Sequence, residues 1–528
     1  MKCLLASKRK KYFMALLIVV GCSIGLVSTD AIDMDSPSVQ VFDHSERNSP
    51  TSVQLERMQP HPVGLIQHDP RSFNGYTLIT RVNSTSTYLI DNEGRIVNEW
   101  KSDQQGFSAY LLPNGRLLRT IISDTEVNHT FLAGGITGRV QELAWDGTVV
   151  WDFTYLGDNH ALHHGMEPLP NGNILMIAWE RKTAREAMEA GRSLMIQGNN
   201  DLWSDHIIEV KPTGKSSGEI VWEWHVWDHL IQNNDSTLPN FGIITEHPEQ
   251  ININPIGWEE HLLPDDLERL QSIGYVGGDS DSQPDKTNAD WTHMNAVSYH
   301  PEFDQIAISV PGFHEIWIID HRTTSAEAAG HHGGKRGKGG DLLYRWGNPL
   351  AYAAGSENDQ QLFAQHDVQW ISQGRKGAGN LLLFNNGRGR WDGEYSSVIE
   401  ITLPIDQNGN YKTEKGRPFV PVRTIWNYSA PQKTDFYASF LSGAQRLPNG
   451  NTLICNGMTG AIFEITENGE IVWHYFLPND DVDSIAYSLA GYRTGLFTVR
   501  RYAPEFSGLV DQNLTPGDTI EAVLKNPT

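Results

Sequence analysis

Cysteine is nearly absent from the 528-residue sequence, which contains only Cys3, Cys22 and Cys455. The first two lie in an N-terminal targeting segment, so Cys455 has no partner in the rest of the chain. A disulfide framework and a zinc site built from thiolates are therefore excluded.

Positive charge is also scarce. The sequence has 41 Lys and Arg residues against 64 Asp and Glu residues, which gives a formal net charge of −23. An acidic surface repels phosphate backbones, so we expect no nucleic-acid partner. Any anionic ligand must be held by a local positive site.

Long helical runs are few, whereas glycine and proline number 49 and 26. Hydrophobic residues make up 39% of the chain and include 16 tryptophans, enough to bury a sizeable core. This composition is typical of a turn-rich, β-dominated protein. The length allows one large domain or two to three ordinary ones.

The N-terminus has the pattern of a secretory signal, with a basic stretch at 8–11 and an apolar run over 13–27. We predict a signal peptide over 1–28 and a linker over 29–74. Residues 19–22 also resemble a bacterial lipobox, which would leave Cys22 lipidated as the first mature residue and tether the protein to a membrane. In both cases the protein is exported, to the periplasm, the cell surface or the medium.

A degenerate repeat fills the rest of the chain. A glycine-containing turn is followed by a short apolar segment that ends in tryptophan, as in residues 146–151 and 468–473. Six copies end at Trp100, Trp151, Trp222, Trp346, Trp426 and Trp473. The sequence Leu-Pro-Asn-Gly stands at 112–115, 169–172 and 447–450, each time before an alternating apolar run. Asn and Gly tolerate the positive φ of a hairpin turn.

Each unit therefore has a hairpin, a strand, a turn and a final strand ending in tryptophan. Such repeats predict an all-β fold, a six-bladed β-propeller over 75–528 with loop and helical insertions. The largest insertion spans about 229–290 and carries a short helix at 264–272, and a Gly/Lys-rich loop at 331–340 is another. A β-sandwich with coincidental turns is the alternative.

Polar residues recur at one position of consecutive units. His164 and Ser442 each precede the leucine of a Leu-Pro-Asn-Gly turn by five residues, and His366 precedes Ile371 by five. His293 lies just before the strand expected at 296–299. In a propeller these side chains would converge on the central axis. Histidine clusters also bind metals, which remains an alternative, although we assign no metal ligand.

Two amides and two guanidiniums follow a predicted strand in the fifth unit. Asn386, Arg388 and Arg390 lie in this Gly-rich stretch. Such groups can clamp a planar oxyanion through paired hydrogen bonds. A polar turn with solvated arginines is an equally good interpretation.

Together these motifs resemble the arylsulfotransferase family of exported six-bladed propellers, which do not use the nucleotide donor PAPS. The resemblance runs over about 75–480. The matching stretches are His163-His164, Pro170-Asn171-Gly172, Asp290-Trp291-Thr292-His293-Met294-Asn295, Gln365-His366, Phe384-Asn385-Asn386-Gly387 with Arg390, and Tyr395-Ser396-Ser397.

The resemblance implies transfer of a sulfuryl group from an aryl sulfate ester to a phenolic acceptor through a sulfated histidine, without a cofactor. It implies that His366 is the nucleophile and that His293 and His164 are catalytic. His163, Asn295, Asn386, Arg388, Arg390 and Ser442 are the predicted substrate-binding residues. A neutral imidazole is both a good nucleophile and a good leaving group, which suits two displacements on one histidine.

One departure from the family pattern concerns its catalytic arginine, expected in a Ser-x-Arg turn. Here the turn is Ser309-Val310-Pro311, with Pro311 at the arginine's position. Arg388 or Arg390 could replace it. The alternatives to a sulfotransferase are a sulfate-ester hydrolase, a metal-dependent enzyme on the same histidines, and a non-catalytic ligand-binding propeller. The sequence specifies neither the natural substrates nor the oligomeric state.

Overall fold

The computed structural model describes residues 62–82, 84–122, 130–131, 133–193, 201–255, 289–412, 419, 423–478 and 495–525. The chain divides into Met1–His61 and Pro62–Thr528. The predicted signal peptide, Cys22 and the helix expected at 264–272 lie outside the described residues. Within the described residues, no helix is both long and apolar enough to span a membrane.

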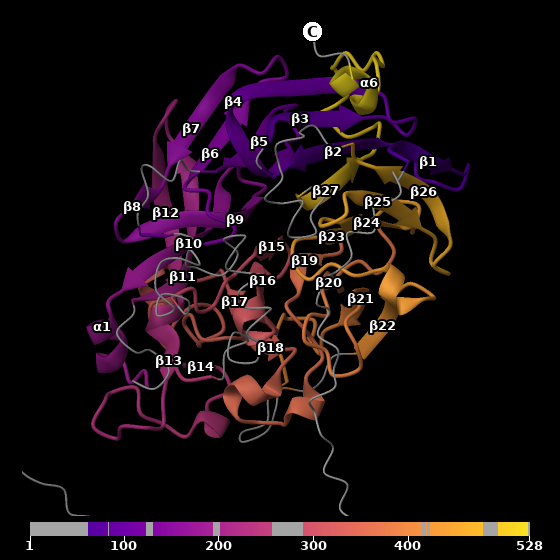
Figure 1. The fold of residues 1–528 in the computed structure, drawn as a ribbon. Coiled ribbons are helices and arrows are strands. Elements are labelled where there is room, and N and C mark those ends of the chain that lie inside the picture. Colours follow the sequence, from indigo (N-terminus) through magenta and orange to yellow (C-terminus); the bar gives the residue numbers. More distant parts are fainter. Residues whose placement is uncertain are drawn as a thin grey trace, which may run out of the picture. The chain divides into compact units, whose positions relative to one another are not determined.

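The second unit is built mainly of antiparallel sheets, so the prediction of a mostly β fold is confirmed (Figure 1). The largest sheet has seven strands in the order β27-β2-β3-β4-β5-β6-β7. Their bounds are β27 (Leu496–Tyr502), β2 (Tyr76–Arg81), β3 (Ser84–Ile90), β4 (Ile96–Leu111), β5 (Leu117–Ile121), β6 (Arg139–Leu143) and β7 (Val149–Thr154).

Two sheets have five strands each. The first contains β8 (Leu156–Gly157), β9 (His160–Pro168), β10 (Ile174–Lys182), β11 (Leu202–Pro212) and β12 (Gly218–His225). The second contains β23 (Gly443–Arg446), β24 (Thr452–Asn456), β25 (Ala461–Ile465), β26 (Ile471–Phe476) and, at its outer edge, β1 (Gly64–His68).

Two further sheets have four strands each. They are β15 (Ala296–His300), β16 (Gln305–Val310), β17 (Glu315–Asp320) and β18 (Tyr344–Trp346), and β19 (His366–Trp370), β20 (Leu381–Asn385), β21 (Ser397–Thr402) and β22 (Arg423–Tyr428). A small parallel pair, β13 (Leu230–Ile231) and β14 (Ile251–Asn252), belongs to the predicted insertion.

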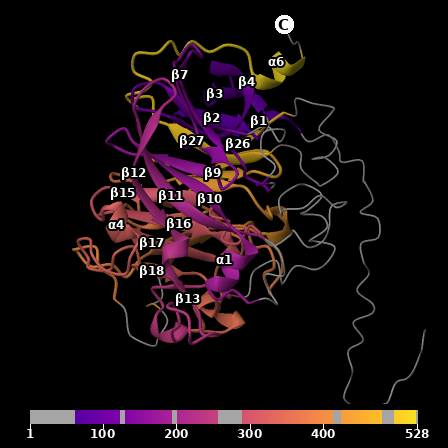
Figure 2. The same ribbon diagram turned by 90° about the vertical axis from the view of Figure 1, so that its left-hand side faces the viewer.

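Helices are short and peripheral to the sheets. In the described part of the chain, the α-helices are α1 (Ala184–Glu189), α4 (Ser325–Ala328) and α6 (Ile520–Lys525), and the 3-10 turns are η2 (Val226–His229), η3 (Ile244–Glu246), η6 (Pro311–Phe313), η7 (Pro349–Tyr352), η8 (Glu357–Asp359) and η9 (Lys433–Asp435). Ile520 and Leu524 of α6 pack in the same apolar cluster as β2 and β26, and both views place α6 beside β1 (Figures 1 and 2).

The inner strands of successive sheets contact one another in a closed cycle. In order they are β4, β9, β15, β19, β23 and β27, and β27 contacts β4 again. Residues from all six strands line one cavity of about 190 Å³. Two of the lining residues form an ion pair: both terminal guanidinium nitrogens of Arg500 on β27 donate to the carboxylate of Asp367 on β19, at 3.1 and 2.5 Å.

The Leu-Pro-Asn-Gly turns form hairpins as predicted. They join β4 to β5, β9 to β10 and β23 to β24. Their glycines Gly115, Gly172 and Gly450 have φ of 80°, 85° and 89°, the left-handed region that residues with a Cβ rarely adopt.

Five of the six repeat tryptophans donate to a carbonyl or hydroxyl oxygen of another repeat: Trp100 bonds within the seven-stranded sheet, and the other four bond the sheet that follows. The indole N–H of Trp100 donates to Ala144, that of Trp151 to Ser217, that of Trp222 to Thr323, that of Trp426 to Glu467 and that of Trp473 to Asn92, at 2.8–3.1 Å. The last of these joins residues 381 positions apart. The repeat therefore ties neighbouring sheets together at their outer strands.

Strands near both ends of the unit complete sheets formed by distant parts of the chain. β27 pairs antiparallel with β2, and β1 pairs antiparallel with β26. β27 thereby completes the seven-stranded sheet at its edge. β1 falls within the predicted linker 29–74, so the folded unit begins before residue 75. An edge strand as short as β1 gives little sequence signal, since most of its side chains are exposed.

Loss of the indole N–H at residue 473 is expected to destabilise the fold. Trp473→Phe leaves the Asn92 carbonyl unbonded in a buried position, which costs about 1–3 kcal/mol before any cavity is counted. Trp426→Phe is the matched control, because its bond to Glu467 is exposed to water. Denaturant midpoints should fall further for the first variant. Equal midpoints would show that the bond between the last and first sheets adds no stability.

Candidate functional site

Three histidines from three different sheets meet at the inner strands. His164 lies in β9, His293 just before β15, and His366 at the start of β19. All are buried, with exposed fractions of 0–1%. The ring centroids of His164 and His293 are 4.6 Å apart. The ring centroid of Phe497 on β27 lies 5.8 Å from that of His164 and 6.4 Å from that of His366. The structure thus brings together the three predicted catalytic histidines.

The backbone is unusual where the chain enters these strands. His164 and His293 have φ of 52° and 50°, and Ser442, at the same predicted position, has φ of 83°. Residues with a Cβ seldom adopt this region, and such outliers cluster at functional sites. Gly135 makes room for His164, since a Cβ there would lie 2.1 Å from Cε1 of the ring.

Hydrogen bonds fix the tautomer of His366. Its Nδ1 lies 3.0 Å from the Ala364 carbonyl and 2.8 Å from Oδ1 of Asn386. Both partners are acceptors, because the amide nitrogen of Asn386 donates to the carbonyls of Ala438 and Leu441. Nδ1 therefore carries the hydrogen. Nε2 is left with a lone pair, and it has no hydrogen-bond partner among the described residues.

His366 is neutral at physiological pH. Burial lowers its pKa to about 3, with a smaller contribution from the nearby positive charges of His293 and Arg388, while the hydrogen bonds to Asn386 and Ala364 oppose the shift. Arg388 is itself buried, with 8% of its surface exposed. Its guanidinium is thus close enough to act on His366 electrostatically.

Each of the other two histidines is backed by a buried carboxylate. Nδ1 of His293 lies 2.5 Å from Oδ2 of Asp290, whose Oδ1 accepts a bond from the indole of Trp179 at 2.9 Å. Asp290 therefore fixes the His293 ring and can stabilise it as an imidazolium, as carboxylates do for catalytic histidines.

His164 is connected to a carboxylate through His163. Nε2 of His163 donates to Asp205 at 3.0 Å, and the two Nδ1 atoms of His163 and His164 are 2.8 Å apart. With His163 neutral, its Nδ1 accepts, so His164 donates from Nδ1. Burial holds the pKa of His164 well below its usual range, and the charges of His293, His163 and His366 act in the same direction. His163 also stacks on Trp179 at 4.0 Å.

Asn295, Ser442 and Arg390, which were predicted to bind substrate, all form hydrogen bonds within the protein. Asn295 donates to the carbonyl of Gln365, directly before His366, at 2.9 Å. The hydroxyl of Ser442 accepts a bond from the amide of Gly457 at 3.0 Å. Arg390 bonds Asp392 and the hydroxyl of Tyr395, so its charge is shared with a carboxylate at the surface. Pro311, which stands where the resemblance expects an arginine, begins the buried turn η6.

Sequence reasoning assigned no role to Asp205, Asp290 or Trp179. Asp290 has a weak signal, since it lies three residues before His293. Asp205 and Trp179 have none, because they face each other as cross-strand neighbours in the pairing of β10 with β11. Met294 and Thr292 donate to Asp205, at 2.6 and 2.7 Å, which ties it to the strand entry that carries His293.

The fold and this histidine centre together define a mostly β protein with a buried, neutral imidazole, His366, held in one tautomer. The family model for arylsulfotransferase (ASST) matches residues 64–476. The chain therefore belongs to the arylsulfotransferase family, as the sequence motifs predicted. No curated protein matches the chain.

Solved structures resemble it only distantly. A protein of unknown function from Bacteroides caccae is 11% identical, with a TM-score of 0.38, covering 81% of this chain and 98% of that one. An inactive virginiamycin B lyase from Staphylococcus aureus is 8% identical, with a TM-score of 0.32 and coverage of 80% and 90%. The β-propeller domain of Cps50 (Swd1) from Myceliophteria thermophila is 8% identical, with a TM-score of 0.35 and coverage of 78% and 89%. We draw no conclusion from likenesses at these scores.

We predict that the protonation state of His366 does not change between pH 5 and pH 9. Because its folded-state pKa is about 3, the ring should keep its hydrogen on Nδ1 and stay neutral from pH 9 down to pH 5. Nitrogen-15 NMR of labelled imidazoles, assigned by comparison with His366→Ala, measures this directly. Protonation of His366 near pH 6.5, the value of a solvated imidazole, would contradict the geometry.

Proposed function

We propose that the protein transfers the sulfuryl group of an aryl sulfate ester to a phenolic acceptor by a ping-pong route through His366. The observation that carries this proposal is the unpartnered lone pair of His366 Nε2, held in one tautomer by Asn386 and lying beside the buried Arg388. A neutral imidazole so held needs no deprotonation before it attacks.

In the first half-reaction, Nε2 of His366 forms a bond to sulfur while the bond from sulfur to the aryl oxygen breaks. The departing phenolate takes a proton from Nε2 of an imidazolium, for which His293 is suited by the carboxylate of Asp290. The second half-reaction runs in reverse. The acceptor phenol gives its proton to His293, its oxygen bonds to sulfur, and the bond from sulfur to Nε2 breaks.

Positive charge near the transferring group is supplied by Arg388 in this account. The sulfuryl oxygens carry negative charge throughout the transfer, and fixed charges in a dry site stabilise it strongly. With Pro311 at the family arginine's position, Arg388 is the buried guanidinium that acts on His366. Arg390 does not take this role, because Asp392 already compensates its charge.

We also propose that the sheets form six blades. The cycle of six inner strands supports this, and so do the four tryptophan bonds that join one sheet to the next. In this interpretation the 16-residue strand β4 belongs to two blades, which accounts for the seven-stranded sheet. His164, His293 and His366 would then come from three different blades.

The mature protein should release nitrophenol from 4-nitrophenyl sulfate when phenol is present and form phenyl sulfate. His366→Ala should lower the rate by more than about 10⁴-fold, the scale for loss of a nucleophile. His474→Ala, on the outer strand β26, is the control and should retain activity. Release to water alone would replace the proposal with a hydrolase, and a His366→Ala variant of full activity would refute it.

The two arginines of the Gly-rich stretch should behave differently. Arg388→Gln should lower the transfer rate by about 10²–10³-fold, the usual cost of removing one group that stabilises transition-state charge. Arg390→Gln should change it little, since Arg390 pairs with Asp392. The measurement is kcat at saturating donor and acceptor. Comparable losses in both variants would mean that the stretch acts through its folding and not through the charge of Arg388.

A further inference from the structure

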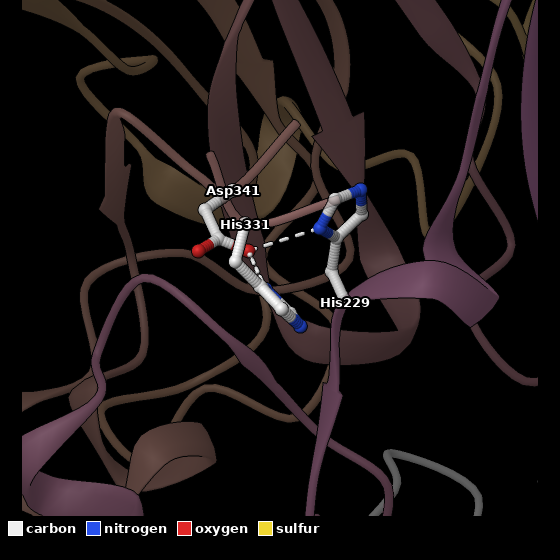
Figure 3. A group of neighbouring side chains, drawn as sticks. All are labelled: His229, His331 and Asp341. Carbon is white, nitrogen blue, oxygen red and sulfur yellow. Dashed lines mark hydrogen bonds and ion pairs between the residues drawn. The ribbon is translucent and has the colours of Figure 1, made fainter. Parts of the chain in front are cut away.

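A second cluster of ligand-type side chains lies outside the histidine centre. His229 ends the turn η2, while His331 and Asp341 flank the Gly/Lys-rich loop between α4 and β18. Figure 3 shows both imidazole rings turned toward the carboxylate of Asp341. Among the described residues, this is the one group of three or more His, Cys, Asp or Glu side chains whose ligand atoms all lie within 4.8 Å of one another.

The hydrogen bonds of His229 leave a lone pair facing a carboxylate. Nε2 of His229 lies 2.9 Å from the carbonyl of Ala328, which can only accept, so Nε2 carries a hydrogen. In a neutral ring Nδ1 then has no hydrogen, yet it lies 2.9 Å from Oδ1 of Asp341. A lone pair and a carboxylate oxygen repel at this distance unless a proton or a cation lies between them.

His331 approaches the same carboxylate oxygen. Its Nδ1 lies 2.8 Å from the same Oδ1 of Asp341, and the amide nitrogen of Gln250 approaches that Nδ1 at 3.3 Å as a donor. Two imidazole nitrogens thus converge on one carboxylate oxygen. Imidazole nitrogens and a carboxylate oxygen gathered at one point are the ligands of a transition-metal site.

The surrounding structure holds the set in place. Trp224 stacks on His229 with centroids 5.4 Å apart, and its indole donates to the carbonyl of Gly340 at 2.7 Å. A Cβ on Gly340 would lie 2.0 Å from the Ala328 carbonyl oxygen and 2.6 Å from Nε2 of His229. Glycine is therefore required where the loop closes over the ring. The carbonyl on Nε2 is the usual outer-shell partner of a ligating imidazole.

We propose that His229 Nδ1, His331 Nδ1 and a carboxylate oxygen of Asp341 bind one divalent transition-metal ion of the zinc type. Two nitrogens and one oxygen favour zinc, cobalt or nickel over magnesium and calcium, which prefer oxygen ligands. Tetrahedral ligands of zinc lie about 3.3 Å apart. The set needs to open by only a few tenths of an ångström to admit the ion.

The ion would join the predicted insertion, through His229, to the Gly/Lys-rich loop, through His331 and Asp341. Three protein ligands leave a fourth position for water or for a ligand. His331 lines a cavity of about 490 Å³ together with Trp227 and His247, so the fourth position is within reach of small molecules. The proposed sulfuryl transfer does not depend on this ion.

Metal-free full-length protein without a histidine tag, titrated with Co²⁺ and with Zn²⁺ in competition, tests the proposal. We expect one ion per chain and the visible absorption of tetrahedral cobalt. His331→Ala and Asp341→Asn should each weaken the affinity by more than about 100-fold, since loss of an outer-shell partner alone costs about 10–100-fold. His332→Ala, the neighbouring exposed histidine, and His366→Ala should bind the ion as the unmodified protein does.

The proposal fails if the unmodified protein binds neither ion at micromolar concentrations, or if His331→Ala binds as tightly. It fails equally if His366→Ala loses the ion while His331→Ala keeps it, since the ion would then be bound at the histidine centre of His164, His293 and His366. His331 is half-exposed, so its replacement should leave the circular dichroism and melting of the metal-free protein unchanged. Those two measurements separate loss of the ion from loss of the fold.

Discussion

The bond between a tryptophan indole at the outer edge of one sheet and an oxygen of the next is the interaction on which the rest of this structure depends. A sheet with one apolar face must cover that face, and here each sheet is covered by its neighbours. The indole fixes the register of neighbours at the rim, and the bond from Trp473 to Asn92 joins the last sheet to the first. The inner strands then contact one another in a cycle, and residues of all six line one cavity.

Where the inner strands meet, hydrogen bonds within the protein orient the histidine rings before any substrate binds. Asp290 orients His293, Asp205 orients His163 and through it His164, and Asn386 orients His366. The distinction between a carboxylate and an amide is physically important. A carboxylate would favour the charged ring, whereas the neutral amide of Asn386 fixes the hydrogen on Nδ1 and leaves His366 uncharged. In the proposed reaction, His366 is the ring that attacks sulfur and His293 is the ring that carries the proton.

The sequence predicts the parts of this architecture that are encoded locally. Leu-Pro-Asn-Gly turns and tryptophan-ended strands revealed the hairpins, and the five-residue offset found His164 and His366. Features that depend on pairing between distant segments were not predictable. β1 was placed in a linker, and Asp205 and Trp179, which contact His163, are brought together only by the register of β10 with β11. The offset also included Ser442, whose hydroxyl bonds the backbone of Gly457, because a shared backbone kink does not require a shared chemical role.

The central claim is that His366 Nε2 carries the sulfuryl group between donor and acceptor. The most direct measurement is peptide mapping by mass spectrometry after brief exposure of the protein to 4-nitrophenyl sulfate alone, with quenching in alkali to preserve the nitrogen–sulfur bond. The account predicts one added sulfuryl group on the peptide that contains His366, and its disappearance when phenol is added before the quench. Transfer to phenol with no adduct at any stage, or with the adduct on a different residue, would contradict the account.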